Sequence, residues 1–442
     1  MSQEGNLEAP TRHPLDWKNP DFYDTAKTQA EMERIFDICH GCRRCFNLCN
    51  AFPLLFDAVD ATPLGELPQV PKTLLWEVVD QCYLCDMCYM TKCPYTPPHP
   101  FNLDFPHTML RAKAVQFKAG KPNFRDKLLT STDALGKLAS IPVVVEMVNA
   151  VNRNSLTRAV MDRTLGIHKD RQLPTYSAKT FHKTARPQES FAVRDGARTP
   201  GKVLVYATCY INYNEPGIGL DLLKVLAHNE IPVRLLDKEA CCGMPKLELG
   251  DLERVAELKA LNIPKLAQMV REGYALMTPI PSCSLMFKQE LPLLFPDDPE
   301  VKLVAQALYD PFEYFSLRHA DGLLNTDFKQ GLGQVSYHVP CHLRVQNMGL
   351  KTRELLQLIP GTTVNTVERC AGHDGTWGVK SEHFATSMKI GAPVFKRMQD
   401  PAPDYVSSDC PIAARHILQG MQTDHPKAHP LTLLRIAYGL DA

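Results

Sequence analysis

Short apolar runs alternate with amphipathic segments beyond residue 200. VLVYAT (203–208) is rich in β-branched residues, LDLLKVLAHN (220–229) repeats its apolar positions at helical spacing, and PVRLL (232–236) is a second short apolar run. This order is typical of strand-helix-strand units with parallel strands. The pattern therefore predicts an α/β region in the second part of the chain.

The same order of elements occurs a second time. Strand 334–339, helix 351–359 and strand 362–367 repeat the three elements above, and each copy closes with a strand that runs into a cysteine, at 275–283 and 404–410. An internal repeat of this length indicates two related units, which we place at 201–330 and 331–442. In open parallel sheets the carboxyl ends of the strands form the ligand crevice, so the cysteines that follow the strands are expected there.

A helical connector is expected at 117–200. Residues 135–154 and 156–167 have an amphipathic pattern that Pro142 interrupts. We expect the apolar positions to pack against a neighbouring domain, with a membrane or partner surface as the alternative. These positions are Leu135, Leu138, Ile141, Val144, Val145 and Val148.

Composition narrows the classes of function. Of 442 residues, 49 are Lys or Arg and 49 are Asp or Glu, so a net charge of zero gives no reason to expect nucleic acid as a partner. Residues 1–20 lack the apolar core of a secretory signal, and no uncharged apolar run reaches the roughly 18 residues that a spanning helix needs. We expect a cytoplasmic protein, with peripheral contact at the inner face of the membrane left open.

Fifteen cysteines are a high number for a chain of 442 residues. Disulfides are a poor explanation in a chain without an export signal, and metal binding is a better one. Eight of the cysteines fall between Cys39 and Cys93, four between Cys209 and Cys283, and the other three are Cys341, Cys370 and Cys410.

The eight early cysteines form two ferredoxin-type runs within a small, mainly helical domain expected at 30–116. The runs are CHGCRRCFNLC and CYLCDMCYMTKCP. In such runs three close cysteines hold one [4Fe-4S] cluster and the distant fourth serves the other cluster. This rule predicts two clusters, one on Cys39, Cys42, Cys45 and Cys93, the other on Cys82, Cys85, Cys88 and Cys49. The alternatives are zinc, which also accepts two-residue cysteine gaps, and a cysteine-rich loop without metal.

The first α/β half offers four more thiolates from three loops. They are Cys209, Cys241, Cys242 and Cys283. Adjacent cysteines on an extended backbone point in different directions, which suits a cluster with several irons better than one tetrahedral ion. We expect a further iron-sulfur cluster here, and the alternative is a pair of buried structural cysteines.

The chain resembles the proteins related to the B subunit of heterodisulfide reductase, and more closely the iron-sulfur subunit of anaerobic glycerol-3-phosphate dehydrogenase. The resemblance rests on the two ferredoxin runs, on LPTYSAKTF, ATCY, ACCG and PSCSLMFKQE, and on YHVPCH, CAGHDGTWG, KIGAPVF and SSDC. It implies two cysteine-rich halves whose clusters exchange electrons with a quinone or a disulfide. It also implies a subunit whose flavoprotein partner performs the substrate chemistry.

The chain departs from the pattern of that family at three positions. Met286 and Ala413 stand where the last cysteine of each half is expected, and Ala371 interrupts the second Cys-Cys-Gly. The second half therefore keeps only Cys341, Cys370 and Cys410, so its cluster needs another ligand or an open iron. His373 is the candidate ligand, and the alternative is a half without metal. His338 and His342 are interpreted as hydrogen-bonded neighbours of Cys341.

These observations predict a mixed α/β protein with one ferredoxin-type domain, a helical connector and two halves with parallel sheets. We expect an electron-transfer subunit that relays electrons between a dehydrogenase, expected to be a flavoprotein or other redox protein, and a quinone or other acceptor. The alternative is catalysis, the reduction of a disulfide or small acceptor at the α/β crevice, so the sequence leaves open whether the chain is itself an enzyme. A third class is a metal-bound sensor or scaffold.

Overall fold

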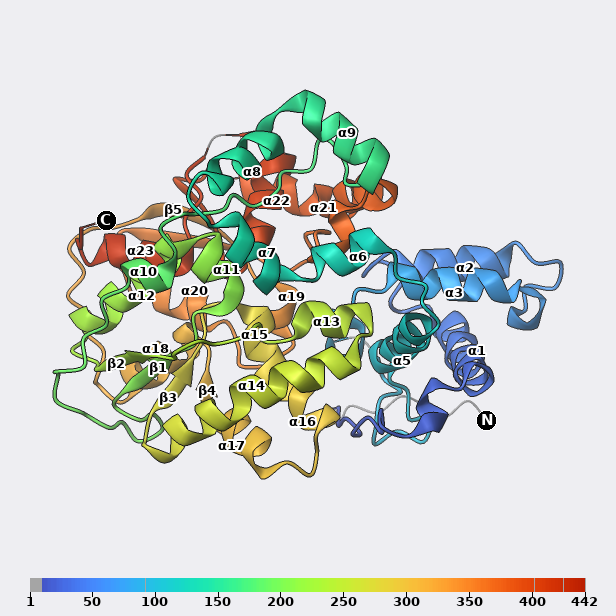
Figure 1. Cartoon of the computed structure of the whole chain (residues 1–442), viewed down its shortest axis with the longest axis horizontal. Coiled ribbons are helices and arrows are strands. Elements are labelled where there is room, and N and C mark those ends of the chain that lie inside the picture. Colours follow the sequence, from blue (N-terminus) through green and yellow to red (C-terminus); the bar gives the residue numbers. More distant parts are fainter. Residues whose placement is uncertain (1–9, 92, 401, 424, 442) are drawn as a thin grey trace.

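The computed structural model describes residues 10–91, 93–400, 402–423 and 425–441. The early cysteine runs form a compact helical lobe at one side of the molecule, and the two sheets lie at the other side (Figure 1). In the connector, α8 (Val144–Arg153) and α9 (Ser155–Leu165) lie near α21 (Ser381–Gln399) and α22 (Pro411–Met421) of the second half (Figure 1), and Ser381 Oγ donates a hydrogen bond to Asp162 of α9. The expectation of a mixed α/β protein with parallel sheets is confirmed.

The helical lobe is built around a core of aromatic and aliphatic side chains. Asp24 begins its first helix by accepting a hydrogen bond from the backbone N–H of Lys27, which satisfies one of the free donors of the first turn. Phe36, Phe52 and Phe105 pack together at the centre of the lobe. The elements are η1 (Pro20–Tyr23), α1 (Thr25–Cys42), α2 (Ala51–Asp60), η2 (Leu67–Gln69), α3 (Lys72–Gln81), α4 (Met87–Thr91) and α5 (Phe105–Lys118).

The connector consists of short helices separated by sharp turns. The break predicted at Pro142 is present, and the next residue, Val143, has φ 74° and ψ −49°. Asn154 begins the following helix, where its side chain accepts hydrogen bonds from Leu156 and Thr157 N–H. The elements are α6 (Phe124–Leu129), α7 (Thr132–Ala139), α8 (Val144–Arg153), α9 (Ser155–Leu165) and α10 (Phe181–Thr184).

The first half contains a four-stranded parallel sheet in the order β2-β1-β3-β4. The central strands pair Val203 with Val233 on one side and with Ala275 on the other. The strands are β1 (Val203–Val205), β2 (Val233–Leu235), β3 (Ala275–Met277) and β4 (Leu308–Tyr309). Its helices are α11 (Thr208–Tyr213), α12 (Pro216–His228), α13 (Met244–Leu249), α14 (Leu252–Arg271), α15 (Pro281–Leu285), η3 (Met286–Glu290), α16 (Leu291–Leu294), α17 (Pro299–Ala307) and α18 (Pro311–Ala320).

The second half repeats the three central strands in the order β6-β5-β7, again parallel. Val335 pairs with Val364 and with Tyr405. The strands are β5 (Gly333–His338), β6 (Thr362–Val367) and β7 (Tyr405–Ser408). The helices are α19 (Cys341–Arg344), α20 (Lys351–Leu356), η4 (Trp377–Val379), α21 (Ser381–Gln399), α22 (Pro411–Met421) and α23 (Pro430–Ala437).

The two halves are packed together by the last helix, α23, which contacts α12 of the first half. The hydroxyl of Thr432 donates to the carboxylate of Asp221 at 2.5 Å, and Arg435 Nε lies 2.8 Å from the same carboxylate. Glu215, just before α12, pairs with Arg415 and Lys427 of the second half. The repeated units therefore share one packed interior.

Candidate iron-sulfur sites

The first group of cysteines lies where α1 ends. Cys39 and Cys42 are in the last turn of α1, Cys45 follows in the loop, and Cys93 comes from the end of the second run. The four side chains line one small cavity with Phe52. Burial raises the pKa of the Cys39 thiol, and the nearby thiols of Cys93, Cys45 and Cys42 raise it further.

The second group is formed by Cys49, Cys82, Cys85 and Cys88, which line a separate small cavity. Phe52 also borders this cavity, so one buried aromatic ring lies between the two groups of thiols. Burial raises the pKa of the Cys82 thiol to about 11. Both groups of four are thus assembled by the fold, although their role as ligands stays a prediction.

Residues with positive φ bend the two cysteine loops around their cavities. Arg43 ends α1 with φ 54°, and its N–H donates to the carbonyl of Cys39 at 2.8 Å. In the second loop Leu84 and Asp86 have φ of 53° and 60°. Because these conformations are uncommon for residues other than glycine, the loops are held by their surroundings rather than by local preference.

The chemistry of both groups fits a cluster better than a lone ion. Zinc draws four ligands to within about 2.3 Å of one point. Among the described residues, no three His, Cys, Asp or Glu side chains converge in a manner that would hold a single metal ion. Thiolates around a multi-iron cluster bind different irons and stand farther apart, and four thiols around one hollow match that arrangement.

In the first half the four predicted cysteines meet at the carboxyl ends of the strands. Cys209 lies in α11 after β1, Cys241 and Cys242 follow β2, and Cys283 lies in α15 after β3. The thiol of Cys241 contacts those of Cys209 and Cys242, and Cys242 contacts Cys283. Hydrogen bonds from Cys209 and Cys242 lower the pKa of Cys241 well below its usual value.

Two residues that sequence reasoning missed support this site. The carboxamide of buried Asn262 on α14 accepts from Ala240 N–H at 2.9 Å and donates to the carbonyl of Cys241 at 3.1 Å. The hydroxyl of Thr132, at the start of α7, lies 3.3 Å from Cys209 Sγ and 3.6 Å from Cys241 Sγ. Neither position has a local sequence signal, because both contacts join segments distant along the chain.

The space expected for a fifth cysteine in the first half is filled by Met286, which is fully buried. Its Cε lies 3.4 Å from the position that a Cβ would take at Gly243. Gly243 has φ 103°, a conformation that other residues rarely adopt, so it allows the chain to turn directly after Cys242. The four remaining thiols therefore form a closed group with apolar packing behind it.

In the second half the three cysteines follow β5, β6 and β7 in the same way. Cys341 begins α19, Cys370 follows β6, and Cys410 precedes α22. Burial raises the pKa of the Cys341 thiol, and the thiols of Cys370 and Cys410 add to this effect. The structure therefore brings all three together.

The histidines of the second half lie mainly against groups other than the cysteine thiols. The ring of His373 lies 5.5 Å from that of His416, and burial, His416, Arg171 and Arg415 lower its pKa well below the usual value. His338 has Ser408 Oγ at 3.2 Å from one ring nitrogen and the carbonyl of Arg369 at 2.9 Å from the other. Nδ1 of His342 lies 2.8 Å from Ser282 Oγ. Ligation by His373 stays a prediction.

The second ferredoxin loop lies directly against the thiols of the second half. The hydroxyl of Tyr83 is 3.1 Å from Cys370 Sγ. Burial raises the pKa of the Cys85 thiol, and the thiols of Cys341 and Cys370 raise it further. The pKa of Cys49 is also raised by burial and, to a smaller extent, by Cys370. Two of the predicted sites are therefore neighbours, although they lie far apart in the sequence.

These features define a cysteine-rich iron-sulfur protein with ferredoxin-type loops and a duplicated α/β unit. The cysteine-rich domain model known as CCG matches residues 203–288 and 335–414. The C subunit of anaerobic glycerol-3-phosphate dehydrogenase from Escherichia coli K12 is 30% identical over 342 residues, which cover 76% of this chain and 82% of that protein. The chain belongs to the family of CCG-containing proteins that includes this dehydrogenase component.

Two other relatives match shorter parts of the chain. The B subunit of fumarate reductase (CoM/CoB) from Methanothermobacter marburgensis is 29% identical over 254 residues, 55% of this chain and 48% of that protein. The lactate utilization protein A of Bacillus cereus strain B4264 is 28% identical over 215 residues, 47% of this chain and 87% of that protein. These matches agree with the family that the cysteine pattern indicated.

Proposed function

We propose that this chain is an iron-sulfur electron-transfer subunit of an oxidoreductase complex. It relays electrons between a dehydrogenase partner, a flavoprotein in our proposal, and a quinone or other acceptor. The observation that carries this proposal is the contact between the second ferredoxin loop and the second half, where Tyr83 meets Cys370. Adjacent sites allow electrons to pass between the two parts of one chain. Two relatives, named as subunits of a dehydrogenase and of a reductase, support it.

Iron-sulfur clusters would supply one-electron transfer at these sites. In the proposal Cys39, Cys42, Cys45 and Cys93 hold one [4Fe-4S] cluster, Cys49, Cys82, Cys85 and Cys88 hold the other, and Cys209, Cys241, Cys242 and Cys283 hold a further cluster. Cys341, Cys370 and Cys410 would hold another cluster in the second half. The chain's own residues set the surroundings. Phe52 is buried between the first two groups, and the Thr132 and Tyr83 hydroxyls approach cysteine sulfurs, where hydrogen bonds tune the potential.

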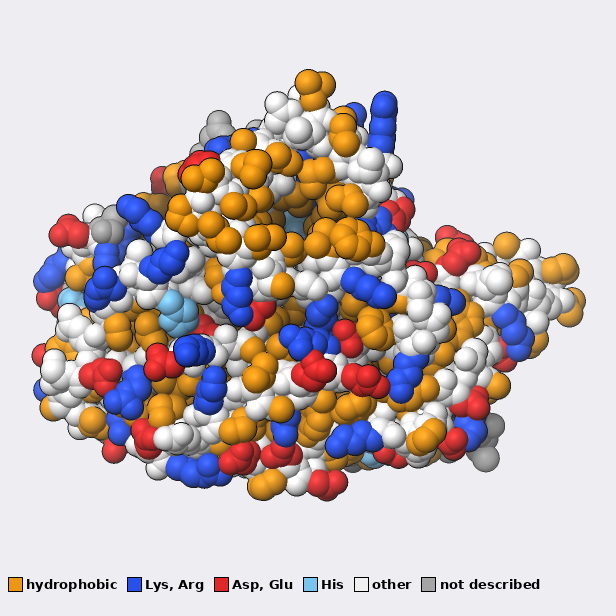
Figure 2. Space-filling model, in the orientation of Figure 1, with side chains coloured by type: hydrophobic (Ala, Val, Ile, Leu, Met, Phe, Trp, Pro, Cys, Tyr) orange, Lys and Arg blue, Asp and Glu red, His pale blue; other side chains and the backbone are white. Residues whose placement is uncertain are grey.

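We also propose peripheral contact with the inner face of a membrane through an apolar surface on the connector (Figure 2). This surface consists of Leu138, Ile141, Val143, Met147, Val151, Leu156 and Val160. The prediction that Leu138 and Ile141 pack against a neighbouring domain was wrong, since both side chains are exposed. No single helix among the described residues is long and apolar enough to span a bilayer, and the pair α7 and α8 that together passes is bent by 111°.

Two further observations support the membrane contact. Val143 is 79% exposed at a backbone conformation near the rare γ-turn, which is strained for a β-branched residue. The exposed charged side chains between residues 131 and 164 are Lys137, Arg153, Arg163 and Glu146, so basic residues outnumber acidic ones. An apolar surface bordered by cations suits an anionic lipid surface. We therefore propose that the protein lies on the cytoplasmic side of this membrane.

The test is anaerobic purification of the full chain together with the partners that it retains. We expect a flavoprotein to copurify, and we expect iron and acid-labile sulfide in the preparation. Serine variants of Cys88 and Cys242 should each remove a different part of the iron and a different low-temperature paramagnetic signal. Zinc in place of iron, or an unchanged iron content in both variants, would contradict the proposal.

The catalytic alternative, reduction of a disulfide or small acceptor at the α/β crevice, has less support in the structure. Met286, Ala371 and Ala413 are all buried and occupy positions where disulfide-reducing relatives are expected to have cysteine. Disulfide reduction by the isolated chain with a reduced dye would favour this alternative. Its absence, with normal iron content, would favour the relay.

A further inference from the structure

Arg171 is a buried cation of the connector that reaches into the second half. It lies between α9 and α10, and its surface is only 2% exposed. Its Nε donates to the carbonyl of Gly378 at 2.7 Å, and its Nη2 donates to Ser387 Oγ at 2.7 Å. Nη1 contacts Nδ1 of His416, and the guanidinium lies over the ring of Phe384, 4.8 Å from its centroid. The guanidinium is therefore enclosed by the second half.

No carboxylate in the described part of the chain pairs with this guanidinium. Burial alone lowers the pKa of Arg171, to about 10, so the group is still charged at neutral pH. The titratable side chains that approach it are basic, with His416 in contact and His373 and Arg415 in the same neighbourhood. Buried charges in proteins are normally paired or bound to a metal, because removing an unpaired charge from water is unfavourable. Arg171 lacks the partner that its burial requires.

Other basic side chains near the thiols of the second half do have acidic partners. Arg415 and Lys427 lie 3.0 Å and 2.6 Å from Glu215. Arg344 lies 3.6 Å from Glu368. Their charges are balanced without any bound group, and the guanidinium of the connector differs from them in this respect.

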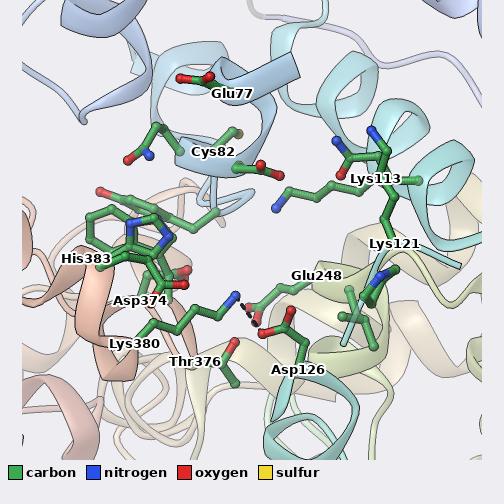
Figure 3. Close-up of a pocket in the computed structure, with 18 of the residues that line it drawn as sticks. Glu77, Cys82, Lys113, Lys121, Asp126, Glu248, Asp374, Thr376, Lys380 and His383 are labelled. Carbon is green, nitrogen blue, oxygen red and sulfur yellow. Dashed lines mark ion pairs between the residues drawn. The ribbon is translucent and has the colours of Figure 1, made fainter. Parts of the chain in front are cut away.

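The acidic side chains on the outer side of the same region have cations of their own. There a charged cavity of about 690 Å³ lies where the ferredoxin lobe, the connector and both halves meet (Figure 3). Lys380 Nζ lies 3.0 Å from Asp126, as the dashed line in Figure 3 marks, and Arg125 lies 2.7 Å from Glu382. Arg171 does not line this cavity, so its charge is not balanced there.

Hydrogen bonds lead from Arg171 to a candidate cluster ligand. Ser387 Oγ, which accepts from Arg171, donates to the carbonyl of Gly372 at 2.6 Å. The N–H of Gly372 donates in turn to Cys370 Sγ at 3.3 Å. Gly372 has φ 77°, and a Cβ at this position would collide with the backbone carbonyl oxygen of Ser387, so the close approach requires glycine. Arg171 thus helps to hold the amide that faces the Cys370 sulfur.

The three thiols of the second half provide a group that can carry the missing negative charge. The ends of β5, β6 and β7 bring Cys341, Cys370 and Cys410 together, and a backbone N–H directed at a sulfur is typical of iron-sulfur sites. An iron-sulfur cluster held by three thiolates is an anion, and one-electron reduction makes it more negative. A cation nearby therefore stabilises the reduced state more than the oxidised one.

We propose that Arg171 is the counter-charge of an anionic iron-sulfur cluster in the second half and that it raises the reduction potential of this cluster. The ligands of the cluster are Cys341, Cys370 and Cys410. Arg171 is a positioning residue, since it acts through Ser387 and Gly372 and through its charge rather than by binding iron.

The inference rests on the proposed relay function and adds a reason for electrons to enter the second half. Tyr83 of the ferredoxin loop meets Cys370, so the two sites are neighbours. Reduction by one electron adds one negative charge to the second-half site and requires no proton. A buried cation that raises the potential of this site favours transfer to it from the ferredoxin lobe.

The test is a redox titration of the full chain with its iron, followed by low-temperature paramagnetic resonance. Cys370→Ala assigns the signal of the second half. Arg171→Met should lower the midpoint potential of that signal by about 59 mV or more, which is a tenfold change in the equilibrium constant for one electron. Arg171→Lys keeps the charge and should restore most of the shift. Should Arg171→Met not retain iron, Arg171→Gln, which keeps hydrogen-bond donors, serves the same test.

The matched control is Arg125→Met. Arg125 is also an arginine of the connector in contact with the second half, but it pairs with Glu382. This variant removes the same charge and should leave the potential of the second half unchanged. Ser387→Ala breaks the link to Gly372 and keeps the cation, so its shift should be smaller than that of Arg171→Met.

The outcomes separate the role of Arg171 from the relay. An unchanged potential in Arg171→Met and Arg171→Gln, with iron retained, overturns the inference and makes the contacts of Arg171 structural. An equal shift in Arg171→Lys and Arg171→Met overturns the role of the charge. Normal ferredoxin signals without any signal that Cys370→Ala removes also overturn the inference and leave the ferredoxin relay intact. A chain without iron overturns the proposed function itself.

Discussion

The hydroxyl of Tyr83 and the sulfur of Cys370 lie 3.1 Å apart although 287 positions separate them in the sequence. Tyr83 is between two cysteines of the second ferredoxin run, and Cys370 belongs to the second α/β half. This single contact joins parts of the chain that the sequence presents as separate domains.

Tyr83→Phe should therefore change a redox potential more than it changes stability. A hydrogen bond to a cysteine sulfur stabilises the reduced, more negative state, so its loss should lower the potential of the second-half site. A typical bond of about 1 kcal/mol corresponds to a shift of about 40 mV for one electron. Redox titration followed by paramagnetic resonance measures this shift. Tyr89→Phe, in α4 of the same ferredoxin run but bonded to the carbonyl of Thr11, should leave the potential unchanged.

Arg12→Met should destabilise the contact between the ferredoxin lobe and the first half. The buried guanidinium lies 2.6 Å from Asp86, 3.0 Å from Asp104 and 3.3 Å from Glu290. Removing one partner from a buried charged network leaves uncompensated carboxylates and costs about 3–5 kcal/mol. Denaturant unfolding measures the loss. The exposed pair of Arg34 and Glu31 provides the control, since Arg34→Met should cost at most about 1 kcal/mol.

The same network should make this contact sensitive to pH. Burial and Arg12 lower the pKa of His107, but Asp104 and Glu290 outweigh them and raise it, so its contribution is complete below about 6.5 and is lost as pH rises through the higher folded value. Burial raises the pKa of Glu290, but His107 and Arg12 outweigh this and lower it to about 2. Its contribution is therefore present above about 4.5 and is lost as pH falls toward 2.

Stability should consequently be greatest between about pH 4.5 and 6.5 as far as these two groups decide it. Unfolding measured across this range tests the expectation. His107→Gln should flatten the alkaline side and Glu290→Gln the acid side. An unchanged profile in both variants would show that other groups control the pH dependence.

Val143→Asp combined with Met147→Asp should weaken binding to vesicles of anionic phospholipid. Each side chain is more than half exposed, and burying such a residue in lipid contributes about 1.5–3 kcal/mol. The double variant should therefore bind at least about tenfold more weakly in cosedimentation. Val193→Asp, an exposed valine outside the apolar surface, should bind normally. Equal binding by all three proteins would exclude this surface as the membrane contact.

His373→Ala and Cys370→Ala together should decide the ligands of the second half. If His373 is a ligand, as the sequence predicts, its loss should lower the iron content and remove the paramagnetic signal of this half, whereas an unchanged signal would show that its place beside His416 is only structural. Cys370→Ala should remove both. Loss of the signal in both variants would show that His373 is a ligand, and no change in either would mean that this half holds no metal.

Local patterns predicted much of the fold because the strands and helices are short and regular. The strands at β1, β5, β6 and β7 begin within one residue of their expected positions. β1 ends at Val205, earlier than predicted, because the chain turns at Thr208, whose φ is 67°, to present Cys209. The pattern of apolar residues does not contain this turn.

The surroundings of the sites were less predictable. Thr132, Asn262 and Arg12 act through contacts with distant segments, and none has a recognisable spacing to the cysteines it supports. The periodicity of the connector showed an apolar face but could not show whether anything covers it. Leu138 and Ile141 illustrate this limit, because only the packed structure shows that both are exposed.

The position of α23 against α12 determines when this protein can become complete during its synthesis. The ribosome releases α12 some two hundred residues before α23, and the contacts of Thr432 and Arg435 with Asp221 must wait for that last helix. Because chains emerge at about 5–20 residues per second, the outer face of α12 is uncovered for on the order of ten seconds or more. The first half therefore emerges with this face of α12 open to non-native contacts until α23 covers it.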